Sequence, residues 1–306
     1  MENYLLTKLA PCAPSPMTDT KSVINFAFFG TDEFAVVTLG ALLEKGYRPS
    51  VVVTVPDQPR GRKLILTPPP LKLFAQKKRL EVWQAEQTIE LFTNLKSNND
   101  DLFIVASYGR LLPPAILAIP AHGVLNIHPS LLPLGRGPSP IQSAILTGQT
   151  ETGVTIIKLD DELDHGPMIA SQKVNVGELG FQELRDRLAE TGADLLAKIL
   201  PRWIAGEIEP QAQNHDLATF THKISKEMGE LKRGDDPQIN YRKFRALTPW
   251  PGVYFWATGR QNLMIRVIVK DARLDRGQFI IDRVVPESRQ ELAWSDFIKN
   301  YTPVAK

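Results

Sequence analysis

The chain has 306 residues, of which 43% are hydrophobic and 23% are charged, and its formal net charge at pH 7 is +2. This composition excludes a fibrous or a disordered protein, and the length allows a core large enough for two domains. No apolar run approaches the roughly 20 residues of a membrane-spanning helix, so no membrane partner is expected.

Cysteine and histidine usage argues against a metal centre. Cys12 is the only cysteine, which excludes an internal disulfide and a thiolate cluster. The five histidines are scattered and show no HExxH spacing, so no metal is expected. A single cysteine also agrees with a reducing compartment. We therefore expect a cytoplasmic protein, in a bacterial cytosol or in an organelle matrix.

The first segment, residues 1–22, lacks the basic stretch and the long apolar run of a signal peptide. Its Pro and Ser content and the lack of a core pattern predict a flexible arm that is dispensable for activity. Met17 is an alternative translation start within this arm.

Apolar strands and amphipathic helices alternate after the arm. The expected elements are strands at 24–29, 50–55, 101–107 and 123–128, with helices at 34–45 and 87–98 between them. This alternation predicts an α/β domain with a doubly wound, mostly parallel sheet. A strand pair at 153–158 and 168–174 and a long amphipathic helix complete the domain, which we expect to span 23–205.

The stretch 206–215 is polar, contains Pro210 and has neither helical nor strand periodicity, so it is predicted to be an interdomain linker. Short alternating strands separated by turn residues follow, in TPWPGVYFWA, in NLMIRVIVK, which ends at Lys270, and in GQFIIDRVV. They predict a smaller C-terminal β-barrel over 216–306. From Asn214 onward there are sixteen Lys and Arg against eleven Asp and Glu. This basic excess fits either a solvated surface or a polyanionic partner.

The first strand ends at Gly30, where a dinucleotide-binding G-x-G-x-x-G motif would need three glycines. Nicotinamide and flavin binding are therefore disfavoured. Gly30 is interpreted as a tight turn between a strand and a helix.

Two polar residues end a buried strand in the segment NIHPSLLPLGRGPSPIQSAI. Asn126 and His128 are two residues apart, so they share one face of the strand at its carboxyl end, where α/β sheets place ligands. An amide can stabilise a developing oxyanion while an imidazole moves protons near neutral pH, as acyl transfer requires. From this pair alone, a hydrogen-bonding role at the strand end explains the pattern equally well.

Four acids lie about thirty residues further on, in the loop between two predicted strands. They are Asp160, Asp161, Glu162 and Asp164. A carboxylate close to His128 would orient the imidazole and favour its protonated form. The spacing does not choose among the four.

The segments NIHPSLLP, GRGPSPIQSAI, TGVTI and LDHGPMI together resemble the catalytic core of the 10-formyltetrahydrofolate-dependent formyltransferases. The resemblance implies a Rossmann-like catalytic domain, 10-formyltetrahydrofolate as formyl donor and no metal. It implies that Asn126, His128 and Asp164 are catalytic. Residues implied to contact the folate are Ser130, Leu131, Leu132 and Pro133, and, from SYGRLLP, Tyr108, Gly109 and Leu111.

Further segments resemble the members of this family that act on tRNA. These are FFGTDEFA, the basic loop VTVPDQPRGRKLILTPPPLKLFA, and TFTHKISKEMG with RALTPWPGVYF in the second domain. The resemblance implies transfer of the formyl group to methionyl-initiator tRNA for translation initiation, by a monomer with an OB-like C-terminal domain. The implied tRNA contacts are Arg60, Arg62, Lys63, Arg242, Lys243 and Arg245.

The sequence departs from the family pattern at three places. The family usually has two small residues where Pro138-Ser139 stand, and an acidic residue where Met228 stands. It also has a longer run of strands between Lys270 and Phe279. The last departure shortens the second domain, which bears on whether its barrel is complete and on how strongly it contributes to tRNA binding.

A sugar-nucleotide N-formyltransferase, which would keep the triad without the basic loop, is the alternative function. A folate-binding or RNA-binding protein without catalysis is disfavoured because all three triad residues are present.

Overall fold

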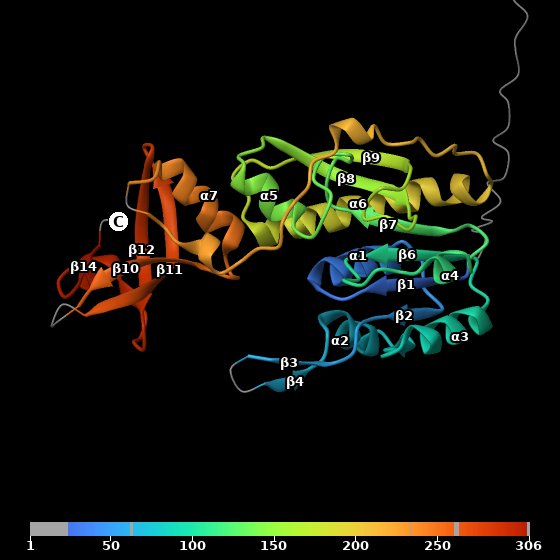
Figure 1. The fold of residues 1–306 in the computed structure, drawn as a ribbon, viewed down its shortest axis with the longest axis horizontal. Coiled ribbons are helices and arrows are strands. Elements are labelled where there is room, and N and C mark those ends of the chain that lie inside the picture. Colours follow the sequence, from blue (N-terminus) through green and yellow to red (C-terminus); the bar gives the residue numbers. More distant parts are fainter. Residues whose placement is uncertain (1–23, 62–63, 233, 260–262, 305–306) are drawn as a thin grey trace, which may run out of the picture.

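Residues 24–61, 64–232, 234–259 and 263–304 are described by the computed structural model (Figure 1). The expected arm at 1–22, with Met17, lies outside these residues. Within the described part of the chain, no helix is long and apolar enough to cross a membrane.

A seven-stranded sheet forms the centre of the first domain, with the strand order β5-β2-β1-β6-β7-β8-β9. The first five strands of this order are parallel, and β8 and β9 are antiparallel additions at one edge. The strands are β1 (Phe26–Gly30), β2 (Val51–Val53), β5 (Val82–Trp83), β6 (Leu102–Ala106), β7 (Val124–His128), β8 (Glu151–Lys158) and β9 (Met168–Asn175). The predicted doubly wound, mostly parallel sheet is confirmed.

Helices cover both faces of this sheet because successive residues of each buried strand point to opposite sides. Phe26 and Phe28 of β1 belong to one apolar cluster, and Ala27 and Phe29 belong to a second. The first cluster lies under α1 (Glu33–Glu44), α2 (Pro70–Lys77), α5 (Pro140–Leu146) and α6 (Phe181–Ile204), and the second lies under α3 (Thr88–Asn98) and α4 (Pro114–Leu117). The expected helices at 34–45 and 87–98 are present, whereas α2, α4 and α5 were not predicted.

Strand order reverses between β1 and β6. The chain leaves β1 toward β2 on one side, while β6 pairs with β1 on the other. Open α/β sheets bind ligands at the carboxyl ends of such strands. Gly30, the last residue of β1, has no room for a side chain: a Cβ there would lie 2.4 Å from Ala35 Cβ and 2.8 Å from the carbonyl oxygen of Ala106. This agrees with the interpretation of Gly30 as a tight turn.

The second domain contains a five-stranded antiparallel sheet in the order β13-β12-β11-β10-β14, which curls into a half-barrel. Its elements are α7 (Pro237–Leu247), β10 (Val253–Thr258), β11 (Met264–Asp275), β12 (Gln278–Pro286), β13 (Leu292–Ala293), α8 (Trp294–Phe297) and β14 (Thr302–Pro303). The strand expected to end at Lys270 continues to Asp275. A two-residue turn, Arg276-Gly277 with φ of 47° and 77°, joins it to β12.

Helix α7 was not predicted, and it connects the domains by packing against α5. Short 3-10 turns at His215–Leu217 and Glu227–Gly229 lie in the segment before it. This segment returns along the first domain before entering the second (Figure 1). A hairpin of β3 (Gln58–Arg60) and β4 (Ile65–Thr67) projects from the first domain toward the side on which the second domain lies (Figure 1).

Candidate active site

Strand β7 presents the two polar residues from a single face. Ile127, between them, packs against α6 so closely that a Cβ at Gly192 would lie 2.5 Å from Ile127 Cγ2. Asn126 and His128 therefore project from the opposite face. Asn126 is half-buried, and its side-chain amide has no hydrogen-bond partner among the described residues. This amide is available to an oxygen of a bound ligand.

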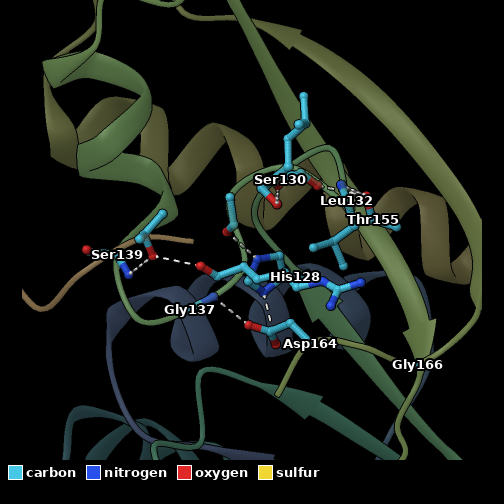
Figure 2. Close-up of polar contacts among 12 residues, drawn as sticks. His128, Ser130, Leu132, Gly137, Ser139, Thr155, Asp164 and Gly166 are labelled. Carbon is cyan, nitrogen blue, oxygen red and sulfur yellow. Dashed lines mark hydrogen bonds and ion pairs between the residues drawn. The ribbon is translucent and has the colours of Figure 1, made fainter. Parts of the chain in front are cut away.

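His128 is buried, and both of its ring nitrogens face oxygen atoms (Figure 2). Nδ1 lies 3.4 Å from Asp164 Oδ1, and Nε2 lies 3.1 Å from the carbonyl oxygen of Gly135. Two acceptors suit a protonated ring, which has an N–H on each nitrogen. The arrangement therefore favours an imidazole that can carry and release a proton.

Of the four candidate acids, Asp164 is the one that lies against His128. Its other oxygen, Oδ2, accepts a hydrogen bond of 2.8 Å from the backbone N–H of Gly137. Asp160 instead lies 2.7 Å from Nδ1 of His165. Asp161 and Glu162 are exposed. The tertiary structure thus makes the choice that sequence spacing left open.

The loop after His128 is held by its own hydrogen bonds. Thr155 Oγ1 donates to the carbonyl oxygen of Ser130 at 2.7 Å and accepts from the backbone N–H of Leu132 at 3.1 Å. Ser130 Oγ donates to the carbonyl oxygen of Leu134 at 2.7 Å. The side chains of Ser130 and Leu132 are buried, whereas Leu131 and Pro133 are half-buried. Of the four residues expected to contact folate, Leu131 and Pro133 therefore have the more accessible side chains.

The loop after β6 lies beside the loop after β1. Thr31 Oγ1 donates to the carbonyl oxygen of Tyr108 at 2.7 Å, and Ser107 Oγ donates to Asp32 Oδ2 at 2.6 Å. Burial raises the pKa of Asp32, although hydrogen bonds from Ser107 and from the start of α1 oppose this. Asp32 and Ser107 were not among the predicted site residues, although they lie within the segments FFGTDEFA and SYGRLLP that carry the resemblance.

The expected folate residues in this loop differ in accessibility. Tyr108 is buried, with its ring edge-on to Phe29 at 5.4 Å between centroids, and burial raises the pKa of its hydroxyl. Gly109 has a φ of +78° and is exposed, and Leu111 is 76% exposed. Gly109 and Leu111 are thus accessible to a ligand, whereas Tyr108 packs against Phe29 and anchors the loop to the core.

A segment from the predicted linker and beyond, residues 211–222, lies along the loop 133–139, and we call it the strap. Thr219 Oγ1 accepts from Gly135 N at 2.8 Å, and Thr221 Oγ1 accepts from Ser139 N at 3.2 Å. Gln213 and Arg136 are also buried here and hydrogen-bonded to each other. Gln213 was not predicted to belong to the site, because an expected linker offers no reason to place its side chains there.

The residues expected to contact tRNA occupy two regions. Arg60 lies in β3, while Arg62 and Lys63 lie outside the described residues. Leu64, Ile65 and Leu66, which follow in the hairpin, are 72%, 62% and 64% exposed. An exposed apolar edge of this kind is a candidate contact surface.

The cations of α7 are partly used within the protein. Arg245 donates to the carbonyl oxygens of Gly177 and Leu179, at 2.8 and 3.1 Å, and so ties α7 to the first domain. Lys243 lies 3.2 Å from Asp235 Oδ2. The Arg242 guanidinium lies against Gly148, where a Cβ would come within 2.3 Å of it. Phosphate contacts from Lys243 and Arg245 would have to compete with these internal contacts.

Comparison with known proteins identifies the family. Residues 23–202 match the model of a formyl transferase domain. The chain is 43% identical over 252 residues to a methionyl-tRNA formyltransferase of Chloroflexus aurantiacus, covering 81% of each chain. It is 33% identical over 298 residues to the protein of the same name from Citrifermentans bemidjiense, covering 91% of this chain and 94% of that protein.

Solved structures share the fold at lower identity. HypX from Aquifex aeolicus, in complex with tetrahydrofolic acid, superposes with a TM-score of 0.64 at 16% identity. The match covers 90% of this chain and spans 47% of HypX. Methionyl-tRNA formyltransferase from Clostridium thermocellum superposes with a TM-score of 0.58 at 17% identity, covering 86% of this chain and 98% of that one. On the matched domain and on these identities, the chain belongs to the formyl transferase family.

Proposed function

We propose that this protein transfers the formyl group of 10-formyltetrahydrofolate to the amino group of methionyl-initiator tRNA. The observation that carries the proposal is the amide of Asn126, which has no partner among the described residues, beside the His128–Asp164 pair at the carboxyl end of β7. The relatives named methionyl-tRNA formyltransferase, which match both domains, support tRNA rather than a sugar nucleotide as acceptor. HypX, a folate-bound structure with the same fold, supports a folate donor.

The residues of β7 fit an acyl-transfer reaction. The bound donor would supply an activated formyl group. Asn126 would donate its free amide N–H to the formyl oxygen as negative charge develops there during attack by the neutral methionyl amine. Protonated His128 would lie on the same strand face and add positive charge to this environment.

His128, supported by Asp164, would then transfer the protons of the reaction. Transfer requires loss of a proton from the attacking amine and delivery of one to the departing nitrogen. His128 can perform both steps because Asp164 stabilises its charged form from the other side of the ring. The imidazole would exchange its contact with Gly135 for the substrate as the reaction proceeds.

The accessible residues of two loops would form the folate pocket. Leu131 and Pro133 approach from the loop after β7, and Gly109 and Leu111 approach from the loop after β6. Both loops follow parallel strands, so they meet at one edge of the sheet, where this class of fold binds ligands.

The acceptor side would use the hairpin and the second domain. Arg60, Arg62 and Lys63 would bind phosphates of the acceptor stem from the β3–β4 hairpin, with help from its exposed apolar residues. Arg242, Lys243 and Arg245 of α7 are the proposed backbone contacts from the second part of the chain. We place the catalytic domain at 23–205, the connection at 206–215 and the tRNA-binding domain at 216–306.

We also propose that the enzyme acts as a monomer in the cytoplasm, because its substrate is needed where ribosomes begin translation. The function is tested by a formyl-transfer assay with three acceptors: methionyl-initiator tRNA, methionyl-elongator tRNA and a nucleotide-linked amino sugar. We expect transfer to initiator tRNA. Transfer to the amino sugar alone would overturn the proposal in favour of a sugar-nucleotide N-formyltransferase.

A further inference from the structure

We propose that Gln213 and Arg136 act as a positioning pair that holds Asp164 against His128. By this inference the strap, which follows the α/β domain in the chain, completes the active site. The inference rests on the proposed function for its kinetic consequences, and on the geometry of the described residues for the pair itself.

Gln213 fixes the backbone of the loop that carries Asp164. Its side chain is buried, and Nε2 donates to two carbonyl oxygens, that of Asp164 at 2.9 Å and that of Gly166 at 2.8 Å. Buried carbonyl groups require such partners, because water cannot replace them. A single amide group therefore binds the loop immediately before and after His165.

Arg136 determines which way the Gln213 amide points. Its Nε and one terminal nitrogen donate to Gln213 Oε1, at 3.2 and 2.7 Å. A guanidinium offers donors alone, so the oxygen of the amide must face Arg136 and the nitrogen must face the two carbonyls. The same terminal nitrogen lies 2.8 Å from Nδ1 of His215. Arg136 is itself buried, so the orientation is held on both sides.

The Asp164 loop needs this support because its backbone is strained. Asp164 has a φ of +51°, in the left-handed region that residues with a Cβ rarely adopt. Gly166 passes so close to the backbone that a Cβ there would lie 1.9 Å from the carbonyl oxygen of Lys158. Conformations of this kind persist when the surrounding structure fixes them, and they concentrate at functional sites.

The strap also places the second group that binds Asp164. Arg136 N donates to the carbonyl oxygen of Thr219, and Thr221 N donates to the carbonyl oxygen of Arg136, at 2.9 and 2.7 Å. These bonds set the position of the next residue, Gly137, whose N–H donates to Asp164 Oδ2. Figure 2 shows this bond from Gly137 to Asp164. Backbone and carboxylate of Asp164 are thus both positioned through the strap.

Gln213 lies beyond residues 23–202, the segment that matches the formyl transferase domain. The chain segment recognisable as the catalytic domain therefore lacks the side chain that holds its acid in place. Positioning residues act through another group, so their removal should reduce turnover more than substrate binding.

The test compares Gln213→Met with Gln211→Met in the full chain. Gln213→Met keeps the volume but removes the two donated bonds and the acceptor of Arg136. We expect kcat to fall about 10- to 100-fold, as for a misplacement of about 1 Å, with the KM for the folate donor changed less than about threefold. Gln211, two residues earlier in the strap, has an exposed side chain with no hydrogen bond in the described structure, and Gln211→Met should leave kcat unchanged.

A double-mutant cycle separates positioning from general loss of structure. In the Asp164→Asn background, Gln213→Met should cost less than about threefold more, because both changes act through the same carboxylate. Equal losses in both backgrounds would overturn the inference. Gln213→Glu keeps the contact with Arg136 but cannot donate while ionised, and should lose turnover to the same extent. Gln213→Glu serves as the test variant if Gln213→Met does not fold.

A readout without turnover distinguishes failure of this inference from failure of the proposed function. The NMR resonances of the His128 ring, recorded at one fixed pH, should shift in Gln213→Met as they do in Asp164→Asn, and should stay in place in Gln211→Met. Unmoved resonances in Gln213→Met overturn the positioning role. Absence of formyl transfer to methionyl-tRNA by the unaltered protein, with the resonances shifted as expected, overturns the proposed function and leaves the positioning pair intact.

Discussion

Asp164 Oδ1 lies 3.4 Å from Nδ1 of His128, although helix α5, strand β8 and the loops around them separate the two residues in the chain. Asp164 Oδ2 is held at the same time by the backbone N–H of Gly137. The carboxylate therefore has one oxygen fixed by the backbone and one directed at the imidazole. The bond from Gly137 keeps the carboxylate from rotating, so that its other oxygen stays directed at the imidazole and orients the ring.

Replacing Asn126 tests whether its amide stabilises the reacting oxygen. Asn126→Ala should lower kcat by about 10² to 10³, the range for loss of one oxyanion donor. Affinity for the folate donor should change little, because the amide acts mainly on charge that develops during the reaction. Single-turnover kinetics and equilibrium donor binding measure the two effects.

His128→Ala should lower kcat at least as much as Asn126→Ala, since it removes both a positive charge and the proton carrier. Near-normal turnover in both variants would contradict the mechanism.

Replacing Asp164 tests the choice among the four acids. Asp164→Asn keeps the shape of the side chain but removes its charge, which faces His128. We expect a lower kcat, because the imidazole loses the carboxylate that orients it and that faces the charge it carries while it moves a proton. The measurement is kcat at saturating substrates.

The neighbouring acids serve as matched controls for Asp164. Asp160 faces His165, and Asp161 is exposed, so Asp160→Asn and Asp161→Asn should have mild effects. These variants share the loop with Asp164 and would reveal general loop damage. If Asp161→Asn is as severe as Asp164→Asn while both proteins remain folded, the assignment of the acid is wrong.

The β3–β4 hairpin gives a prediction for tRNA binding. Replacing Arg60, Arg62 and Lys63 together with Ala should weaken tRNA affinity while donor affinity is kept. The slope of log affinity against log salt should flatten by about one unit, or slightly less, for each phosphate that the variant no longer binds. Filter binding at several salt concentrations measures this slope.

A control variant for the hairpin removes equal charge elsewhere. Lys77, Lys96 and Lys173 are exposed on other parts of the first domain, and their replacement by Ala changes the net charge by the same amount. An equal loss of affinity in this control would show that overall charge, rather than the hairpin, is responsible. An unchanged salt slope in the hairpin variant would remove the hairpin from the interface.

Asp32 gives a prediction for stability against pH. Burial raises its pKa above the ordinary value of 3.8. A carboxyl whose pKa is higher in the folded state contributes stability that is complete below the unfolded value and is lost as the pH rises through the folded value. Asp32→Asn removes this dependence while it keeps an oxygen for the N–H groups at the start of α1. Relative to the unaltered protein, the variant should therefore gain stability as the pH rises from 3.8 toward neutral.

Urea unfolding at a series of pH values measures the effect of Asp32→Asn. Glu90→Gln, at an exposed carboxylate in the first turn of α3, is the control and should leave the pH dependence unchanged. A difference in unfolding free energy between Asp32→Asn and the parent that stays constant with pH would contradict the prediction.

Much of the α/β domain could be predicted because its signals are local. Buried strands such as 24–29 and 101–107 are continuous apolar runs, and the shared face of Asn126 and His128 follows from the period of two in a strand. Helix α7 was missed although its start carries a local signal, the N-cap Asp236 followed by Pro237; what the sequence does not record is its contact with α5 and the first domain. The continuation of β11 to Asp275 was missed because a charged, exposed strand end resembles a loop in sequence.

The sequence by itself determined the alternating sheet, the strand end with Asn126 and His128, and the resemblance that singles out Asp164. Only the tertiary structure decided that Asp164 reaches His128, that Gln213 of an expected linker holds it there, and that Lys243 and Arg245 are engaged within the protein. The physical reason is distance along the chain. Periodicity and turn chemistry act between near neighbours, whereas the bonds that position an acid join segments that meet only when the chain is folded.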